Sequence, residues 1–345
     1  MVVRWLPFTL VPLALALACS PAQLVGPPPP DDASTGDGLG PPPQDGSLPT
    51  TTSVSIIVEP SDKGAGILAA INAAQKSIHV TMYLFTNDTL ADALIAQHKA
   101  GRDVKIVLNQ NFPSAGADNA QEYTKFKAAG IPVVWAPPQF TYTHEKAVII
   151  DGTSAWIMTM NLTFTSPTDN REFLAIDSDP YDVAEAEEIF AADFANRAPT
   201  LTGRLVTAPV NAREKLVRLL NEATKTIDLE GESFSDQGIE DALVAAKKRG
   251  LAVRVLLSDQ QPSTAMAKSV ADLKAAAIPV RKLAVPYIHS KAIVADGTVA
   301  YVGSENFTLN SLDNNRELGV LVSDPGAVKI VADTINKDFN TGVVY

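Results

Sequence analysis

Residues 144–151 of the chain have the sequence HEKAVIID, and residues 289–296 have the sequence HSKAIVAD. Each stretch begins with a histidine, has a lysine two positions later, and ends with an aspartate that precedes a glycine. The four apolar residues between lysine and aspartate predict a buried β-strand that stops at a turn. Because residues i and i+2 of a strand point to the same side, each histidine is expected to share a face with its lysine.

The similarity between the two parts of the chain extends well beyond these stretches. Residues 74–78 and 99–104 recur 149 positions later, and residues 128–133 recur 147 positions later. From position 142 onward the offset is 145, and an asparagine and a glutamate follow each histidine by 17 and 28 residues. The pairs at this offset include Tyr142 and Tyr287, Asn161 and Asn306, Arg171 and Arg316, Glu172 and Glu317, and Asp193 and Asp338. An internal duplication therefore accounts for residues 53–345.

Strand and helix signals alternate within each copy. In the first copy they predict helices over residues 67–76, 90–100, 119–129 and 183–196, and strands over residues 78–85, 104–108, 133–136, 147–150, 155–158 and 172–176. This order predicts an α/β fold of two duplicated halves, residues 53–199 and 200–345, with mixed, largely parallel sheets. Packing about a pseudo-twofold axis would bring matched residues to one interface.

The composition limits the class of protein. A chain of 345 residues with 46% hydrophobic residues can bury a large core. The net charge of −11 is opposite in sign to the footprint of a protein that binds nucleic acid, so nucleic acid is the less favoured partner. The single cysteine, Cys19, excludes an intrachain disulfide and a cysteine-based zinc site.

The first residues have the features of an export signal. Arg4, the apolar run after it and the small residues before Cys19 predict a signal peptide over residues 1–18. The alternative is a membrane-spanning helix, but the run is shorter than the roughly 20 residues that a bilayer requires, and Pro7 and Pro12 interrupt it.

Cleavage there would leave Cys19 as the mature N-terminus. The context resembles a bacterial lipoprotein signal, although Ala16 stands where leucine is usual, and an ordinary signal-peptidase site is the second possibility. Residues 19–52, rich in proline and glycine, predict a disordered spacer. We therefore expect an exported protein, periplasmic or extracellular, that a lipid on Cys19 could hold at a membrane surface.

A site made from both copies would contain two imidazoles, two ammonium groups and two carboxamides. Lysine and asparagine suit the two non-bridging oxygens of a phosphodiester, so neither a metal ion nor another cofactor is needed. One histidine can attack phosphorus while the other protonates the leaving oxygen and then activates the acceptor. Glu172 and Glu317 are the candidates to orient the imidazoles, and Tyr142 and Tyr287 either line the pocket or fill the core.

The pattern His-x-Lys-x4-Asp, followed by Gly-Ser-x-Asn, resembles the phospholipase D superfamily over residues 53–345. The resemblance implies a metal-independent phosphodiesterase or phosphatidyltransferase with a phosphohistidine intermediate. By analogy His144 is the nucleophile and His289 the general acid and base, although the two roles could be reversed. The candidate catalytic residues are His144, His289, Lys146, Lys291, Asp151, Asp296, Glu172 and Glu317, and the candidate phosphate-binding residues are Lys146, Lys291, Asn161, Asn306, Thr159 and Ser304.

The first copy departs from this pattern at one point. Met158 and Thr159 stand where the second copy has Gly303 and Ser304. Threonine keeps the hydroxyl, whereas the loss of glycine is expected to change how closely the backbone approaches the phosphate.

We expect a monomer that hydrolyses or exchanges phospholipid headgroups at a membrane surface without an obligate protein partner. A nuclease of the same superfamily is the first alternative, and the negative charge of the chain disfavours it. A transferase of the cardiolipin-synthase type is the second, less favoured because the mature chain shows no spanning helix. A degenerate binding module is disfavoured, because neither copy has lost its histidine, lysine or aspartate. Water and an alcohol both remain open as acceptors.

Overall fold

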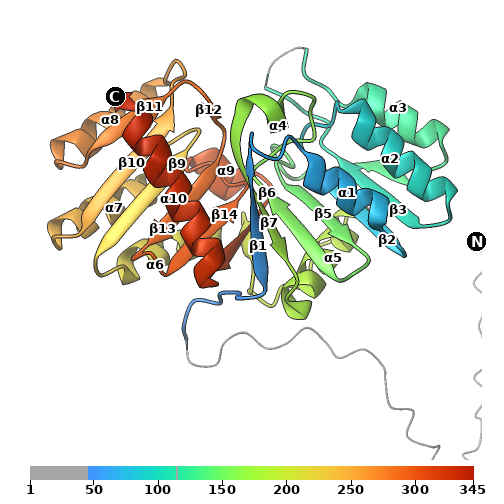
Figure 1. Ribbon diagram of the computed structural model, residues 1–345, viewed down its shortest axis with the longest axis horizontal. Helices are drawn as coiled ribbons and strands as arrows, with labels where there is room; N and C mark the ends of the chain where they lie inside the picture. The colour runs from blue at the N-terminus through green and yellow to red at the C-terminus, as the bar shows by residue number, and fades with distance from the viewer. Residues whose placement is uncertain (1–45, 114–115) are drawn as a thin grey trace, which may run out of the picture. The chain divides into compact units, whose positions relative to one another are not determined.

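The computed structural model describes residues 46–113 and 116–345, so the predicted signal peptide, Cys19 and most of the predicted spacer lie outside the described residues. Within these residues the strands form two mixed sheets of eight strands each, with helices packed against them (Figure 1). The predicted α/β fold class with two related halves is confirmed.

The first half contributes strands β1 to β7 and helices α1 to α5. The strands are β1 (Val54–Glu59), β2 (Ser77–Met82), β3 (Asp103–Leu108), β4 (Val133–Trp135), β5 (Lys146–Ile150), β6 (Ser154–Met158) and β7 (Asn170–Asp177). The helices are α1 (Ala65–Ala73), α2 (Asp88–Lys99), α3 (Ala120–Ala128), α4 (Ser166–Asp169) and α5 (Pro180–Phe194).

The second half repeats this order with short additions. Its strands are β8 (Val206–Ala208), β9 (Thr226–Gly231), β10 (Ala252–Ser258), β11 (Val280–Leu283), β12 (Tyr287–Ile288), β13 (Lys291–Ala295), β14 (Val299–Gly303), β15 (Glu317–Val322) and β16 (Val343–Val344). Its helices are α6 (Ala212–Glu222), α7 (Gln237–Lys248), α8 (Thr264–Ala275), α9 (Leu309–Asn314) and α10 (Pro325–Thr341). No helix within residues 46–113 and 116–345 is both long and apolar enough to cross a bilayer.

The sheets are mixed, but the prediction that they are largely parallel is wrong. Seven strands of the first sheet have the order β1-β7-β6-β5-β2-β3-β4, in which only β2, β3 and β4 run parallel to one another. Its eighth strand, β12 from the second half, pairs in parallel with β7. The second sheet repeats this with β9, β10 and β11 as its parallel part. The reason is the turn between β5 and β6, where Asp151 and Gly152 both have positive φ, because a short turn of this kind joins antiparallel strands.

The two halves share one apolar core and two buried ion pairs. Side chains from β5, β6 and β7 pack together with side chains from β14 and β15. Arg171 on β7 donates to both carboxylate oxygens of Asp338 on α10, and Arg316, just before β15, donates to Asp193 on α5 at 2.9 and 3.1 Å. All four side chains are buried, so loss of one partner would strand an uncompensated charge. These crossed pairs fix the halves in a symmetric arrangement.

The end of the predicted spacer packs on the second half. The backbone of Thr51 accepts a hydrogen bond from Ser323 N at 2.8 Å and donates one to Leu321 O at 2.9 Å. Leu48 packs against the core of that half. The folded part therefore includes residues ahead of the boundary predicted at residue 53, because β8 covers only the beginning of β15 and Thr51 pairs with its end.

Candidate active site

The two histidine motifs lie at matched places on the central strands of their sheets. His144 and Lys146 stand at the start of β5, and His289 and Lys291 stand at the start of β13. The backbone of each motif bonds to the opposite half, because His144 N donates to Arg316 O at 2.9 Å and His289 N donates to Arg171 O at 3.3 Å. Each histidine is thereby placed beside the residue that precedes the other half's glutamate.

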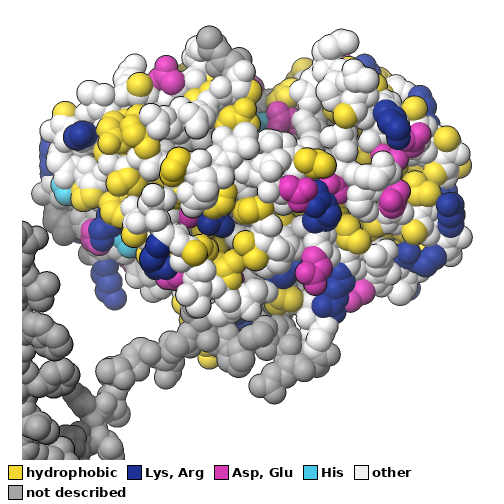
Figure 2. All heavy atoms as spheres, turned by 180° about the vertical axis from the view of Figure 1, so that it is seen from behind, with side chains coloured by type: hydrophobic (Ala, Val, Ile, Leu, Met, Phe, Trp, Pro, Cys, Tyr) yellow, Lys and Arg dark blue, Asp and Glu magenta, His cyan; other side chains and the backbone are white. Residues whose placement is uncertain are grey.

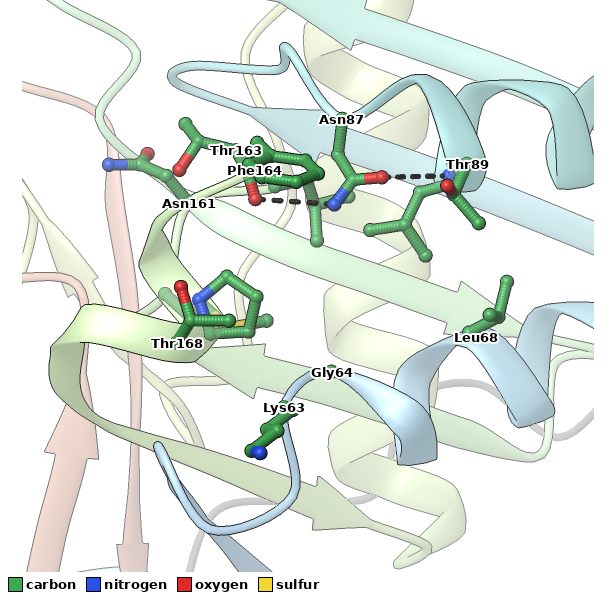
Figure 3. Close-up of a pocket in the computed structure, with 13 residues that line it drawn as sticks. Lys63, Gly64, Leu68, Asn87, Thr89, Asn161, Thr163, Phe164 and Thr168 are labelled. Carbon is green, nitrogen blue, oxygen red and sulfur yellow. Dashed lines mark hydrogen bonds between the residues drawn. The ribbon is translucent and has the colours of Figure 1, made fainter.

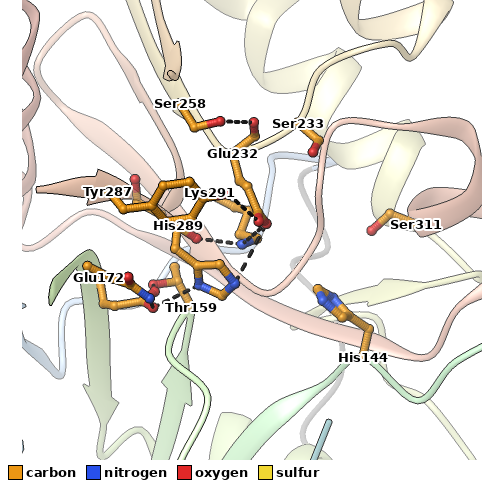
Figure 4. A network of polar contacts seen from close by, with 12 residues as sticks. His144, Thr159, Glu172, Glu232, Ser233, Ser258, Tyr287, His289, Lys291 and Ser311 are labelled. Atoms are coloured by element: carbon orange, nitrogen blue, oxygen red, sulfur yellow. Dashed lines mark hydrogen bonds and ion pairs between the residues drawn. The ribbon is translucent and has the colours of Figure 1, made fainter. Parts of the chain in front are cut away.

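The predicted histidine and glutamate residues pair, and the pairing crosses between the halves. His144 Nδ1 lies 2.8 Å from Glu317 Oε2, and His289 Nδ1 lies 2.8 Å from Glu172 Oε1. Figure 4 shows the two imidazoles on either side of a common space, with Lys291 beside it. The duplication thus brings both imidazoles to one interface, as the sequence predicts.

Both glutamates are fully buried and held by further donors. Glu172 accepts from Thr159 Oγ1 at 2.5 Å, and Glu317 accepts from Ser311 Oγ at 2.6 Å. Burial raises the pKa of each carboxyl, but the neighbouring imidazole and lysine outweigh it and hold the pKa below its usual range. An ionised carboxylate at Nδ1 favours the proton there and leaves Nε2 to face the substrate.

The two lysines are buried cations at the floor of the site. Each Nζ donates to the carbonyl oxygen of its own histidine, Lys146 to His144 and Lys291 to His289. Burial lowers the pKa of Lys146 to about 7 and the pKa of His144 to about 4, and each lowering is reinforced by the charge of Lys291 from the second half. His144 is therefore unprotonated at neutral pH, as a nucleophile must be.

Asn161 and Asn306, the other predicted phosphate ligands, follow β6 and β14. The side-chain oxygen of each is shielded from solvent and has no hydrogen-bond partner among the residues that the structure describes. These oxygens are acceptors, whereas a phosphate would be bound by the amide nitrogens as donors, so the phosphate-binding role of both asparagines stays a prediction.

Thr159 and Ser304 are predicted to contact phosphate, but the structure shows their side chains supporting the neighbouring strands β7 and β15. Both side chains are fully buried. Thr159 Oγ1 donates to Glu172 and accepts from Phe173 N at 2.9 Å, and Ser304 Oγ accepts from Leu318 N at 3.0 Å. The hydroxyls hold β7 and β15 in position, because the strand that carries each orienting glutamate passes beside them.

Asp151 and Asp296 do not belong to the site, contrary to the catalytic role predicted for them. They stand at the far ends of β5 and β13 from the lysines. Asp151 accepts from the backbone N–H groups of residues 75–77 and Asp296 from those of residues 224–226, at 2.6 to 3.0 Å. Although burial opposes the charge, these donors lower the pKa of Asp151 and bring that of Asp296 to about 2. Both aspartates stabilise a turn.

The glycine missing from the first copy also has a structural explanation. A Cβ atom at Gly303 would collide with the Tyr301 hydroxyl, with the Glu305 carboxylate and, at 2.6 Å, with Gly319 Cα. The first half has a buried methionine, Met158, at this position, where the tyrosine, the glutamate and the second glycine have no counterparts. The glycine makes room for a buried side-chain pair, and the expected effect on the approach of the backbone to phosphate stays a prediction.

Sequence reasoning missed two residues that line the site. Tyr83 follows β2 and lies with its ring centroid 4.5 Å from the ring centroid of His144, and Glu232 follows β9 and lies 3.0 Å from Lys291 Nζ. The signal was present, since these positions match at the offset of 149 residues, but their side chains differ.

A pocket in the first half has Asn161 in its lining (Figure 3). Apolar and polar side chains line it in equal number; the apolar ones are Leu68, Leu90, Met160, Leu162, Phe164 and Pro167, and the polar ones are Lys63, Asn87, Thr89, Asn161, Thr163 and Thr168. Phe164 stands over it and is 75% exposed. The pocket therefore joins an apolar surface to a predicted phosphate ligand.

A duplicated α/β fold with two His-x-Lys motifs at one interface defines the phospholipase D class of phosphodiesterases and phosphatidyltransferases. The family described as "Cardiolipin synthase, PLD-like domain" matches residues 67–194 and again residues 216–341. The chain therefore belongs to the phospholipase D superfamily, as the sequence motifs predict. Within the described residues no group of three or more His, Cys, Asp or Glu side chains is placed to hold a metal ion.

Relatives with longer and shorter matches agree with this assignment. The chain is 21% identical to the probable cardiolipin synthase YwiE of Bacillus subtilis, over 85% of this chain and 67% of that protein. It is 32% identical to the mitochondrial cardiolipin hydrolase of Xenopus tropicalis and to the phospholipase D of Rickettsia prowazekii, over 33% and 34% of this chain and 54% and 58% of theirs.

Solved structures share the fold. The phosphatidylserine synthase of Haemophilus influenzae superposes with a TM-score of 0.67 at 12% identity, over 86% of this chain and 89% of that one. The polyphosphate kinase of Porphyromonas gingivalis superposes with a TM-score of 0.64 at 18% identity, over 82% of this chain and 46% of that one. The chain thus spans less than half of the kinase.

Proposed function

We propose that the protein is a phosphatidyltransferase of the cardiolipin-synthase type. The observation that carries the proposal is the crossed arrangement in which His144 pairs with Glu317 and His289 pairs with Glu172. The sequence by itself favours headgroup hydrolysis, but the matching family and the long match to YwiE favour transfer to an alcohol.

The proposed reaction has two steps in which the histidines exchange protons with the alcohols. His144 Nε2 attacks phosphorus, the bond from phosphorus to the headgroup oxygen breaks, and His289 gives its Nε2 proton to that oxygen. The acceptor alcohol then loses its proton to His289 and displaces the His144 nitrogen from phosphorus. Lys146, Lys291 and the two asparagines hold the non-bridging oxygens throughout.

Two features support a lipid substrate over a nucleic acid. On the face shown in Figure 2, lysine and arginine side chains are scattered among aspartate and glutamate and do not form one basic stripe. The apolar part of the pocket that Asn161 lines, formed by Leu68, Leu90, Met160, Leu162, Phe164 and Pro167, suits the acyl end of a lipid.

The test is to supply vesicles of phosphatidylglycerol with EDTA present and to separate the products. Transfer yields cardiolipin and free glycerol, and His144→Ala abolishes both. Phosphatidic acid as the main product would support the second candidate, a phospholipase D hydrolase, which the matches to a cardiolipin hydrolase and a phospholipase D favour. Cleavage of single-stranded DNA with intact lipid would refute both.

The export signal and the lipid on Cys19 remain part of this proposal. A tether of that kind would keep the enzyme beside its substrate. Labelling of growing cells with an alkyne fatty acid is expected to mark the wild-type protein and not Cys19→Ser.

A further inference from the structure

Positions 83 and 232 are equivalent in the two halves but carry unlike side chains. Each is the first residue after its strand, β2 or β9. Tyr83 N donates to Glu145 O at 3.1 Å, and Glu232 N donates to Ser290 O at 3.2 Å, so the backbone of each bonds to the residue between the histidine and lysine of its own motif. The same backbone position therefore presents an aromatic ring to one motif and a carboxylate to the other.

The ring and the carboxylate act on their motifs in opposite ways. The Tyr83 ring lies edge-on to His144, and Lys146 Nζ is 5.0 Å from its centroid. Glu232 Oε2 lies 3.0 Å from Lys291 Nζ and 3.6 Å from His289 Nε2 (Figure 4). His144 therefore has a carboxylate at Nδ1 alone, whereas His289 has one at each ring nitrogen.

Glu232 is held in place by further contacts. Its Oε1 accepts from the Tyr287 hydroxyl at 3.0 Å, and its carbonyl oxygen accepts from Ser258 Oγ and Gln260 Nε2, both at 2.8 Å. Burial opposes its charge, but Lys291 and His289 hold the pKa of the carboxyl well below its usual range. A fixed negative charge beside a site for phosphate opposes substrate binding, so a compensating role is expected of it.

The charged and titratable groups around the His289 ring come from several elements. They are Glu172 on β7, Glu232 after β9, Tyr287 on β12 and Lys291 on β13. One carboxylate lies within ion-pair distance of each nitrogen of the His289 ring, and Lys291 adds a single positive charge beside it. Among the described residues His144, beside the edge of the Tyr83 ring, has only Glu317 within ion-pair distance.

We propose that Glu232 is a positioning residue that makes the two histidines unlike, holding a proton on His289 Nε2 so that this imidazole serves as the acid toward the leaving alcohol. The inference rests on the proposed function. In the first step the proton moves from Nε2 to the departing oxygen as the phosphorus–oxygen bond breaks, and His144 keeps the new bond to phosphorus. In the second step the proton of the acceptor alcohol returns to Nε2, where Glu232 stabilises it again.

The test compares two leaving groups in Glu232→Gln. An alkoxide needs a proton to depart, whereas p-nitrophenolate does not. At pH 8 we expect turnover of phosphatidylglycerol to fall about tenfold and turnover of bis(p-nitrophenyl) phosphate to fall less than about twofold.

Glu232→Asp keeps the charge and is expected to recover most of the lipid activity. Glu187→Gln is the matched control, because Glu187 holds His79 Nδ1 at 2.7 Å outside the site, and it is expected to leave both activities unchanged. Circular dichroism of each variant checks the fold.

Several results would overturn the role of Glu232. Equal losses on both substrates, or no loss on either, would each do so. If the wild-type protein cleaved the nitrophenyl diester and left lipids intact, the proposed function would fail on its own. The leaving-group comparison would then be made with a soluble alkyl diester.

Discussion

The surroundings of the two histidines differ far more than the framework that holds them. Around His144 the side chains are aromatic, with Phe112 and Tyr142 at 5.0 and 6.1 Å from Tyr83. Around His289 the matched tyrosine, Tyr287, is kept, but Glu232 stands where the first half has Tyr83 and accepts from the Tyr287 hydroxyl at 3.0 Å. Duplication has preserved the geometry of the pair, and the divergence of a lining residue is the basis of the unlike roles proposed for the two histidines.

The largest effects are expected from the histidines themselves, and they differ in kind. His144→Ala removes the nucleophile and is expected to lower turnover about 10⁴-fold or more on every substrate. His289→Ala removes the acid, so it is expected to lower lipid turnover about 10³-fold but to spare formation of the phosphoenzyme from a nitrophenyl diester. Rapid quenching and mass spectrometry measure that intermediate. A phosphoenzyme in His144→Ala and none in His289→Ala would reverse the assignment.

Replacement of either crossed arginine is expected to lower stability by a similar amount, and the comparison tests the symmetry of the interface. Arg171→Ala and Arg316→Ala each leave a buried aspartate without its partner and are expected to lower the free energy of unfolding by about 3 to 5 kcal/mol. Urea denaturation measures this. Arg197→Ala breaks an exposed pair and is expected to leave the free energy of unfolding nearly unchanged. Losses that differ widely between the first two variants would show that the halves do not share the interface equally.

The turn aspartates are expected to have a smaller effect, and only on stability. Asp151→Asn and Asp296→Asn remove charged acceptors of backbone hydrogen bonds and are expected to lower stability by about 1 to 2 kcal/mol at pH 7. Asp296 also accepts from Thr224 Oγ1 at 2.8 Å, so its replacement is expected to cost slightly more.

The pH dependence of that effect has a definite sign. Because the pKa of Asp296 is lowered to about 2 in the folded state, its contribution is present above its ordinary pKa and is lost as pH falls through about 2. Denaturation is expected to show the same difference from the wild type at pH 7 and pH 5 and a smaller difference at pH 3. A loss of catalytic activity at unchanged stability would show that these aspartates take part in the reaction.

The smallest effect is expected at two exposed apolar residues that match across the halves. Phe164 is 75% exposed and Leu309 is 59% exposed. Replacement of Phe164 by serine is expected to lower turnover on vesicles a few-fold, about 1 kcal/mol in binding, without changing a soluble diester. Leu309→Ser tests whether one half or both contact the lipid. Wild-type activity of both variants on vesicles would show that neither of these residues contacts the lipid during the reaction.

The sequence predicts what repeats and what is local. The duplication, the order of helices and strands, and the partnership of His144 and His289 with glutamates all follow from matched spacing. The crossing of those partnerships does not, because spacing within one copy gives no information on which half a side chain will reach. The antiparallel part of each sheet is missed for a related reason, since turn geometry at Asp151 outweighs the alternation of helix and strand signals.

Residues that differ between the copies are the harder ones to find. Glu232 matches Tyr83 only at the offset of 149, which differs from the offset of the motifs, and neither residue type repeats. Thr159 is misplaced by the motif because its hydroxyl, which the resemblance assigns to phosphate, bonds to Glu172 in the folded chain. In both cases the role of the residue depends on contacts that form only in the folded chain.

The adjacent residues Arg316 and Glu317 have two different roles. The arginine clamps the halves together, and the glutamate beside it sets the tautomer of an imidazole in the opposite half. A substitution that weakens the interface between the halves there would also misalign the reactive imidazole. The stability of the interface and the alignment of the reactive imidazole therefore depend on the same pair of residues, so a substitution there is expected to affect both.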